Sequence, residues 1–410
     1  MEDFSVVKLN SQLLFHKYIF LKIHILELAH YIYVMQVLIV ADSFKESLDA
    51  GQVAEAIAAG VNKIQPQLTS HCIPFSDGGE GALSVLEKHA KGALVACETV
   101  DALGRPIKAN YFVFEEGKKA WIELSQASGL ALIDAIDRNP LVSSTYGTGL
   151  LIKDALEKGC TEIVLGIGGS ATNDAAAGIF QALGGQLVDK NKAALSKGGA
   201  ALQQLETIVF PTHLDHIKWE IACDVDNPLL GSNGASAVYG PQKGATQKDV
   251  EYLEAALTQF AATLEKKYQR KVEQLKGGGA AGGTAAGMAG FFGAPLVPGF
   301  QLLSEMIQLE KAIEKADIVF TAEGKIDQQS LHGKVAVEVA RLAKKHHKTC
   351  IGLAGAIEGP FPPLYKAGFS GLFSIQQSPM SLEASKEQAA AILTETAANV
   401  FHFHQQTTLK

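Results

Sequence analysis

The stretch VLIVADSFKESLDAGQVAEAIAAGVN, residues 37–62, carries the pattern on which the fold prediction rests. It opens with an apolar, β-branched run that is typical of a buried strand. A helix is predicted over 48–62, where Val53, Ile57 and Val61 fall near one face. A strand followed at once by a helix is the repeating unit of a parallel sheet, so this stretch predicts an α/β fold.

The pattern changes in the middle of the chain and returns near its end. Between residues 93 and 124, strand-like segments follow one another without helices, which predicts antiparallel strands. From residue 145 strands and helices alternate again, including a long helix over 247–268. The glycine-rich KGGGAAGG at 276–283 does not suit the interior of an element. After it we expect a helix over 301–315, a strand over 317–322, a helix over 332–345, strands over 349–353 and 372–376, and a final helix.

A chain of 410 residues exceeds what one hydrophobic core usually supports, so two domains are expected. Because the end of the chain resembles its beginning, we assign residues 35–90 and 291–410 to one Rossmann-like α/β domain with a mostly parallel sheet. Residues 91–290 then form a mixed-sheet α/β domain inserted into it, with the active site in the cleft between the two. Residues 1–34 are treated as an N-terminal extension that function does not need, with Met35 as the functional start. A genuine amphipathic N-terminal helix is the alternative.

Charge and cysteine content exclude several classes of protein. The formal charge of −7, without a run of lysines or arginines, argues against a nucleic-acid binder. Charged residues interrupt the apolar stretch from Leu13 to Val34 and no small-residue cleavage site ends it, so neither a membrane span nor a secretory signal is expected. The five cysteines never form a C-x-x-C pair, which argues against a disulfide framework or a zinc site. We expect a cytoplasmic protein.

The segment GIGGSATND, residues 166–174, follows a predicted strand and precedes a predicted helix. A glycine-rich turn in this position presents backbone N–H groups to an anion, and hydroxyl side chains add donors that suit phosphate oxygens. The same spacing fits the dinucleotide fingerprint, with Asp189 near the place of a ribose-binding acid. An NAD(P)-dependent oxidoreductase and a purely structural turn therefore remain alternatives. The candidate phosphate-binding residues are Gly168, Gly169, Ser170, Ala171, Thr172 and Asn173.

Two more polar clusters follow predicted strands, at the sheet edge where α/β proteins place their ligands. In ADSFKES (41–47), Ser43 and Lys45 are candidates for holding a carboxylate or phosphate, with a solvated helix start as the alternative. PFSDGGEG (74–81) offers a carboxylate beside glycines to a cation or a hydroxyl, unless it only caps a helix. Its candidate residues are Asp77, Gly78 and Gly79.

A fourth cluster, TAEGKID (321–327), combines carboxylates and a lysine beside a glycine, a set that suits a magnesium–phosphate site. Lys325 and Asp327 are its candidate catalytic residues, against the alternative of a solvated loop. Turns or a hinge also explain three weaker segments. These are CDVDNPL (223–229) with Asp224, GPQKG (240–244), and GGGAAGG (277–283) with Gly278 and Gly279.

Taken in order along the chain, these segments resemble the bacterial type I glycerate kinase family. The motifs that carry the resemblance are ADSFKESL (41–48), PFSDGGEGAL (74–83), GIGGSATNDAAAGIFQALGG (166–185), CDVDNPLLG (223–231), GPQKGA (240–245), GGGAAGG (277–283) and TAEGKIDQQSLHGK (321–334). The family's first motif usually reads P-D-S-F-K-G, where this chain has Ala41 and Glu46, and an arginine is common at Lys325. Lysine offers a point charge in place of a bidentate donor, which bears on affinity more than on reaction type.

The resemblance implies two α/β domains with the active site between them, ATP and Mg²⁺ as co-substrates, and glycerate as the phosphate acceptor. It favours 2-phosphoglycerate over 3-phosphoglycerate as the product. Glycerate is then expected at Ser43, Lys45, Asp77, Gly78 and Gly79, and ATP at the 168–173 turn with Gly278 and Gly279. A monomer and a homodimer both remain open, as does an anion sensor without turnover.

The catalytic roles follow as a hypothesis. A carboxylate, Asp327 first and Asp174 second, would orient and deprotonate the acceptor hydroxyl. Lys45 and Lys325 would neutralise substrate charge. Carboxylates drawn from Asp77, Asp224 and Asp327 would hold Mg²⁺ against the phosphates.

Overall fold

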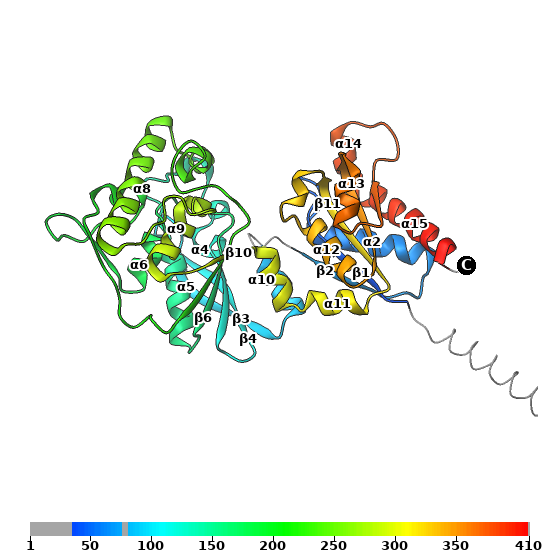
Figure 1. The fold of residues 1–410 in the computed structure, drawn as a ribbon, viewed down its shortest axis with the longest axis horizontal. Coiled ribbons are helices and arrows are strands. Elements are labelled where there is room, and N and C mark those ends of the chain that lie inside the picture. Colours follow the sequence, from blue (N-terminus) through cyan, green and yellow to red (C-terminus); the bar gives the residue numbers. More distant parts are fainter. Residues whose placement is uncertain (1–34, 76–80, 409–410) are drawn as a thin grey trace, which may run out of the picture.

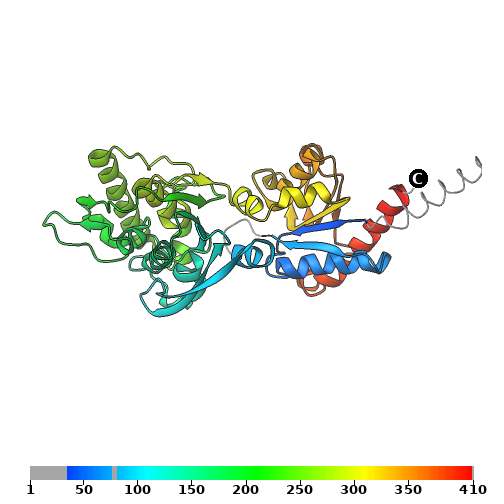
Figure 2. The same cartoon turned by 90° about the horizontal axis from the view of Figure 1, so that it is seen from below.

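The structure, a computed structural model, describes residues 35–75 and 81–408. The predicted N-terminal extension, residues 1–34, lies outside this part. The described chain forms two α/β lobes, each built around its own sheet (Figures 1 and 2). Among the described helices, none is both long and apolar enough to cross a membrane. All five cysteines are free thiols.

The first sheet has five parallel strands in the order β13-β12-β11-β1-β2. The strands are β1 (Val37–Ala41), β2 (Ser70–Pro74), β11 (Ile318–Ile326), β12 (Thr349–Ile357) and β13 (Gly371–Ser374). The side chains of β1 alternate between two cores, because successive residues of a strand point to opposite faces. Val37 and Ile39 pack with apolar residues of α2 (Ala50–Ile64) and α15 (Ala389–Thr408). Leu38 and Val40 pack with those of α12 (Val335–Lys345) on the other face. Both faces of β1 are therefore buried, which explains its uninterrupted apolar run.

The second sheet is mixed, in the order β10-β9-β6-β5-β4-β3. β3 (Gly92–Val100), β4 (Pro106–Phe114) and β5 (Lys119–Glu123) are antiparallel, as predicted, and β6 (Glu162–Gly166), β9 (Lys218–Ala222) and β10 (Leu296–Val297) continue parallel to β5. A separate antiparallel pair joins β7 (Gln186–Val188) to β8 (Thr207–Val209). The helices of this lobe are α4 (Ser125–Ser128), α5 (Tyr146–Glu157), α6 (Ala177–Ala182), α7 (Ala235–Tyr239), α8 (Gln247–Tyr268) and α9 (Ala280–Phe292).

Two helices connect the lobes. α3 (Ala82–His89) packs against β2 of the first sheet and β3, β4 and β5 of the second, and α10 (Gly299–Met306) packs on α3 and β9. Figure 1 shows α10 between the two lobes and α11 (Leu309–Lys315) following it along the lobe of the first sheet. One hydrophobic core accordingly contains Leu38 and Trp121, from strands of different sheets, together with Leu303 of α10. The remaining short helices are α13 (Phe361–Ala367) and α14 (Leu382–Glu387).

The predicted fold class is confirmed, because the ends of the chain form a parallel sheet and the middle forms a mixed one. The domain limits at residues 90 and 290 stay a prediction; residue 90 directly follows α3, whereas residue 290 lies inside α9. The predicted helix over 247–268 is confirmed, and a capping box between Thr246 and Asp249 fixes its start.

Several predicted elements differ from the structure in their bounds. The strand predicted over 349–353, for instance, continues to Ile357 as β12. The helix over 301–315 is in fact two helices, because the backbone of Gln308 is left-handed (φ 56°) and reverses the chain between α10 and α11. The strand predicted to end at residue 322 continues through Ile326, since β12 pairs with it along that length. Most of the TAEGKID cluster therefore belongs to a strand and does not form a loop.

Candidate active site

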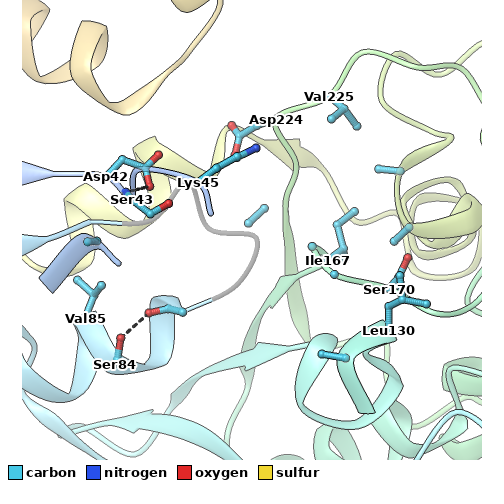
Figure 3. Close-up of a pocket in the computed structure, with 18 of the residues that line it drawn as sticks. Asp42, Ser43, Lys45, Ser84, Val85, Leu130, Ile167, Ser170, Asp224 and Val225 are labelled. Carbon is cyan, nitrogen blue, oxygen red and sulfur yellow. Dashed lines mark hydrogen bonds between the residues drawn. The ribbon is translucent and has the colours of Figure 1, made fainter. Parts of the chain in front are cut away.

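A cavity of about 1030 Å³ opens between the two lobes, at the carboxyl ends of β1 and β2 on one side and of β6 and β9 on the other. This is the edge where ligands bind in open α/β sheets. Asp42, Ser43 and Lys45 lie on one side of it, and Leu130, Ile167 and Ser170 lie on the other (Figure 3). Among the residues that the structure describes, the charged ones that line it are Asp42, Lys45, Asp49, Lys88, Arg138, Asp224 and Lys243.

The glycine-rich turn after β6 presents three consecutive residues, Gly168, Gly169 and Ser170, to the cavity. Gly169 has a left-handed backbone (φ 66°), as the sharp turn requires. Two hydrogen bonds fix the turn to the neighbouring segment: Leu130 N donates to Gly169 O (2.7 Å) and Ala171 N to Ser128 O (2.9 Å). Within the described chain, the amides of residues 168–170 donate no hydrogen bond. They are available to an anion in the cavity.

The predicted helix directly after this turn begins later than expected. Ala175 and Ala176 both adopt left-handed backbone angles, and regular helix starts only at Ala177. A helix N-terminus therefore does not face the phosphate site, and the case for anion binding depends on the turn's own amides and hydroxyl. Ala171, Thr172 and Asn173 lie behind the turn and are buried.

Asp174 is fully buried and does not line the cavity. Its Oδ2 accepts hydrogen bonds from Thr145 N (2.8 Å), Thr145 Oγ1 (3.0 Å) and Gly178 N (3.2 Å). Burial raises the pKa of this carboxyl, although those hydrogen bonds oppose the shift. These contacts make Asp174 a support for the turn and the start of α6.

The glycine run packs tightly against the turn. Gly282 has φ 66°, and a Cβ at this position would lie 2.0 Å from Thr172 O. Ala175 N donates to Gly282 O (3.1 Å). Gly278 and Gly279 pack beside Leu275 and Pro228, outside the cavity lining, while Ala280 and Ala281 line it. The run therefore supports the turn from behind.

The opposite wall is formed by the segment after β1. Lys45 is exposed and makes no hydrogen bond or ion pair with another described residue, so its ammonium group is available to a ligand. Ser43 N donates to Asp42 Oδ1 (2.6 Å). Gly324 of the neighbouring strand β11 lies against this segment, with a Cβ built on it 3.7 Å from Lys45 N. Asp224, which follows β9, accepts a hydrogen bond from Gly299 N (2.9 Å).

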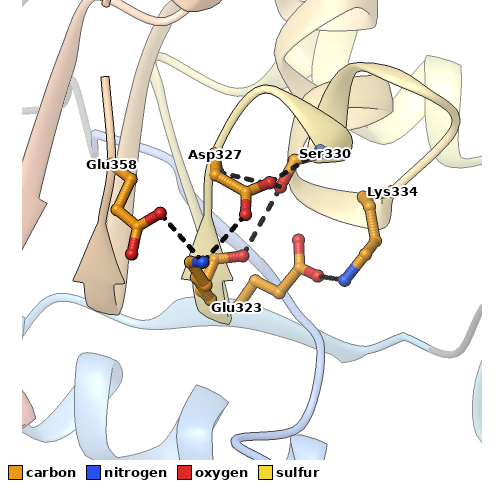
Figure 4. Close-up of polar contacts among 6 residues, drawn as sticks. Glu323, Asp327, Ser330, Lys334 and Glu358 are labelled. Carbon is orange, nitrogen blue, oxygen red and sulfur yellow. Dashed lines mark hydrogen bonds and ion pairs between the residues drawn. The ribbon is translucent and has the colours of Figure 1, made fainter. Parts of the chain in front are cut away.

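Lys325 and Asp327 do not line the cavity. They form a separate ionic cluster at the end of β11, in which Asp327 lies near Ser330 (Figure 4). Lys325 Nζ lies 3.2 Å from Asp327 Oδ2 and 3.0 Å from Glu358 Oε2. Ser330 N donates to Asp327 Oδ1 (3.1 Å). Burial alone would raise the pKa of Asp327, but the hydrogen bonds from Lys325 and Ser330 bring it below its usual value.

A second ion pair joins Glu323 to Lys334 beside this cluster. Burial raises the pKa of Glu323 in spite of Lys334, and the charges of Asp42 and Asp327 add to the effect. Asp42, on the cavity wall, is thus close enough to share an electrostatic field with the carboxylates of β11.

The donor set of the cavity fits a magnesium ion that is shared with phosphates. Among the described residues, no group of three or more His, Cys, Asp or Glu side chains is arranged to hold a metal. A magnesium ion bound with nucleotide phosphates needs only one or two protein carboxylates, however, and Asp42 and Asp224 both line the cavity. Of the predicted metal ligands, Asp224 is at the site, Asp327 lies away from it, and Asp77, with Gly78 and Gly79, lies outside the described residues.

Sequence reasoning missed three cations of the cavity, Lys88, Arg138 and Lys243. Lys243 was visible only as part of the GPQKG segment, which a simple turn explained. Arg138 belongs to no motif, and its Nη1 donates to Gln242 O (3.5 Å) beside Lys243. Nothing in the GPQKG segment indicated what Lys243 contacts, because its partners, Ser170 and Thr172, lie 73 and 71 residues earlier in the chain.

Comparisons with known proteins agree with these observations. The model of the glycerate kinase family matches residues 37–405. The chain is 40% identical to a glycerate kinase of Halalkalibacterium halodurans, covering 89% of this chain and 97% of that one, and 39% identical to the glycerate 2-kinase of Escherichia coli with the same coverage. A crystal structure ascribed to glycerate kinase 2 of Salmonella typhimurium LT2 superimposes with a TM-score of 0.79 at 38% identity, covering 92% of this chain and 100% of that one.

These findings confirm the resemblance drawn from the motifs and the predicted class of ATP-dependent phosphotransferase. Nothing in them supports the oxidoreductase alternative. Asp189, its proposed ribose-binding acid, does not line the cavity. Its carboxylate accepts the amides of Asn191 and Ala193 (both 2.8 Å) and so closes a turn after β7.

Proposed function

The chain belongs to the glycerate kinase family, and we propose that its cleft transfers the γ-phosphate of ATP to the 2-hydroxyl of D-glycerate. The observation that carries the proposal is the pairing, across one cavity, of an anion-binding turn with an exposed lysine. The choice of the 2-hydroxyl is supported by the relative from Escherichia coli, which is named glycerate 2-kinase.

We assign the two substrates to opposite walls. The turn at Gly168–Ser170, with Lys243 and Arg138 beside it, offers amide, hydroxyl and cationic donors for the phosphates of ATP. Across the cavity, Lys45 and Ser43 suit the carboxylate of glycerate, because an ammonium and a hydroxyl are natural partners for a small anion.

Magnesium belongs to the same proposal, with Asp224 and Asp42 as the carboxylates that would hold it. When bound, it would neutralise charge on the phosphates. The protein's own cations and amides add to this effect from the wall opposite Lys45. We also infer that the reaction takes place in the cytoplasm, where ATP is supplied.

Asp327 is the proposed acceptor of the hydroxyl proton. In the transfer, the glycerate oxygen bonds to the γ-phosphorus, the bond to the bridging oxygen of ADP breaks, and the hydroxyl proton passes to the carboxylate. An ionised carboxylate is sufficient for this role, because phosphoryl transfer depends more on positioning the hydroxyl than on a strong base. The low pKa of Asp327 is compatible with that requirement.

An ADP-release assay on the full chain tests the proposal. With magnesium, ATP and D-glycerate we expect turnover, and NMR of the product should show phosphate on the 2-position. L-Glycerate and lactate serve as controls for acceptor specificity. Absence of ADP release above the ATP-only background would refute the kinase, whereas a 3-phosphorylated product would overturn only the choice of hydroxyl.

A further inference from the structure

Lys243 occupies a position that is uncommon for a lysine, because only 2% of its surface is exposed. It belongs to a short 3₁₀ turn, Pro241–Lys243, that lies far along the chain from the phosphate-binding turn. Its Nζ nevertheless donates to Ser170 Oγ (2.8 Å) and to Thr172 O (2.7 Å). Lys243 therefore ties the 240 segment to both sides of residue 171.

The hydrogen bond from Lys243 decides where the Ser170 hydroxyl can point. A serine hydroxyl has one hydrogen to donate and an oxygen that can accept. Because the oxygen already accepts from Lys243, the hydrogen must be directed elsewhere. In the described part of the chain that hydroxyl has no other partner, and Ser170 lines the cavity. The arrangement thus leaves a hydroxyl donor beside the amides of residues 168–170.

The bond to Thr172 fixes the other side of the turn. The carbonyl of Thr172 is held between the ammonium group and the closely packed Gly282, where even one added methyl group would clash. The peptide between residues 172 and 173 therefore cannot rotate without breaking this bond. An ammonium group has three N–H donors, and two of them hold the turn.

The charge of Lys243 is costly where it lies. Burial lowers the pKa of its ammonium to about 7, and only the negative charge of Asp174 opposes the shift. A hydrocarbon side chain would fill the same space without the desolvation cost. A cation in such a low-dielectric setting acts strongly on any negative charge nearby, and the cavity surface at Ser170 is one hydrogen bond away.

We propose that Lys243 is a positioning residue for the phosphates of ATP, which orients the Ser170 hydroxyl and the 168–172 turn and adds a buried positive charge beneath them. The inference rests on the proposed function, because it concerns the same turn. By this inference, Lys243 affects the binding of ATP and does not affect the binding of glycerate, which we assign to the opposite wall.

The test is a comparison of Lys243→Met with the parent chain, both at full length. The variant should lose on the order of 10- to 100-fold in kcat/KM for ATP, as expected when a hydrogen bond from a charged group is removed. The KM for glycerate should stay within about twofold. Lys248→Met removes an exposed lysine at the start of α8 and should match the parent in every parameter.

A double-mutant cycle separates positioning from a general structural role. If Lys243 acts through the hydroxyl, Ser170→Ala should lower kcat/KM for ATP by a similar factor. The double variant should then have a kcat/KM for ATP only slightly below that of the more damaged single variant. Full additivity of the two losses would overturn the inference. So would a normal kcat/KM for ATP in Lys243→Met, or equal losses for ATP and glycerate together with a lower melting temperature.

Calorimetric binding of ATP to the same proteins keeps this inference distinct from the proposed function. A parent chain that binds ATP but does not phosphorylate glycerate would refute the kinase proposal, and weaker ATP binding by Lys243→Met would still support Lys243. Should Lys243→Met fail to fold, Ser170→Ala alone decides: unchanged ATP affinity in that variant would overturn the inference.

Discussion

Glu323, within β11, and Asp327, directly after it, have opposite electrostatic surroundings. Asp327 is held by Lys325 and by the amide of Ser330, and its pKa is below the usual value. Glu323 is buried, and its pKa is raised although Lys334 pairs with it. Of the two, Asp327 is therefore the better candidate for a permanently ionised group that accepts a hydrogen bond from a substrate hydroxyl.

Replacing Asp327 by Asn removes that acceptor while keeping the shape of the side chain. We expect kcat to fall on the order of 100-fold, with the KM for ATP little changed. Lys325 keeps its second partner, Glu358, so the fold should be retained. Steady-state kinetics measure the effect, and Glu358→Gln is the matched control, because it breaks the exposed pair of the same lysine. A near-normal kcat in Asp327→Asn would eliminate the role.

Replacing Lys45 tests whether glycerate binds to the cavity wall formed by the segment after β1. The ammonium group of Lys45 is exposed beside Ser43 and makes no ion pair with another described residue, so Lys45→Ala should cost little stability. Loss of a charged hydrogen bond to the glycerate carboxylate should raise the KM for glycerate roughly 10- to 100-fold and leave the KM for ATP nearly unchanged. Lys63→Ala, which removes a surface pair with Glu395, should alter neither KM. A selective rise in the KM for ATP would reverse the assignment of the two walls.

The buried charge of Lys243 also predicts a dependence of stability on pH. In the unfolded chain a lysine keeps its proton up to about pH 10.4, whereas folded Lys243 loses it near pH 7. The unfolded state binds more protons between these values, so this residue makes the protein more stable as pH rises. Lys243→Met lacks this rise in stability with pH. In that variant the Asp174 carboxylate also loses the attraction of the positive charge at residue 243. The melting temperature of Lys243→Met relative to the parent should therefore be lower at about pH 9 than at about pH 6, while Lys248→Met should show no such trend.

At the level of elements, the start of α9 is shaped by its contact with the phosphate-binding turn. Ala281, Gly282 and Gly283 all have left-handed backbone angles before regular helix begins. Gly282→Ala would combine that backbone strain with the clash at Thr172 O. We expect the free energy of unfolding to fall by about 1–3 kcal/mol because of overpacking, and the affinity for ATP to fall as well.

Gly293 provides the matched control for this substitution. It ends α9 with nearly the same angle (φ 67°), but a Cβ there meets nothing within 4 Å. Gly293→Ala should therefore show only the cost of a left-handed alanine, about 1 kcal/mol, and normal kinetics for ATP. Urea denaturation followed by fluorescence measures both proteins. If both variants lose the same free energy of unfolding, the contact between Gly282 and the turn contributes nothing to stability.

The elements that could be predicted are those whose signal is local. The apolar run of β1, the capped and amphipathic α8 and the antiparallel β3–β5 were all visible in short windows of sequence. Parallel strands bring their carboxyl ends to one edge, so the sequence also indicated that Lys45 and the 168–170 turn belong to sites at sheet edges. Lys243 could not be predicted, because it reaches Ser170 across 73 residues and no local pattern encodes that contact. The burial of Asp174 against Thr145, 29 residues away, was hidden for the same reason.

Viewed as a whole molecule, the protein carries its two proposed substrate walls on different lobes. In the structure the space between them is large, about 1030 Å³, which exceeds the volume of most small-molecule sites. Lys325 and Asp327 lie outside the lining of that space. In-line transfer requires the attacking oxygen to come within about 3–3.5 Å of phosphorus. Lys45 and Asp327 follow strands of the same sheet, so approach of the lobes would bring the γ-phosphate on the opposite wall toward the glycerate hydroxyl.

Closure of the lobes is the prediction that follows, and it is measured by small-angle X-ray scattering. A non-hydrolysable ATP analogue with magnesium and D-glycerate together should lower the radius of gyration more than either ligand alone, because only the pair bridges both walls. In Lys45→Ala the analogue should still bind, but glycerate at the same concentration should add little compaction. If the radius of gyration is the same with and without both ligands, the lobes already have their reactive arrangement. That outcome would contradict the predicted closure, and a carboxylate that lines the cavity, such as Asp42, would then be a better candidate than Asp327 to orient the hydroxyl.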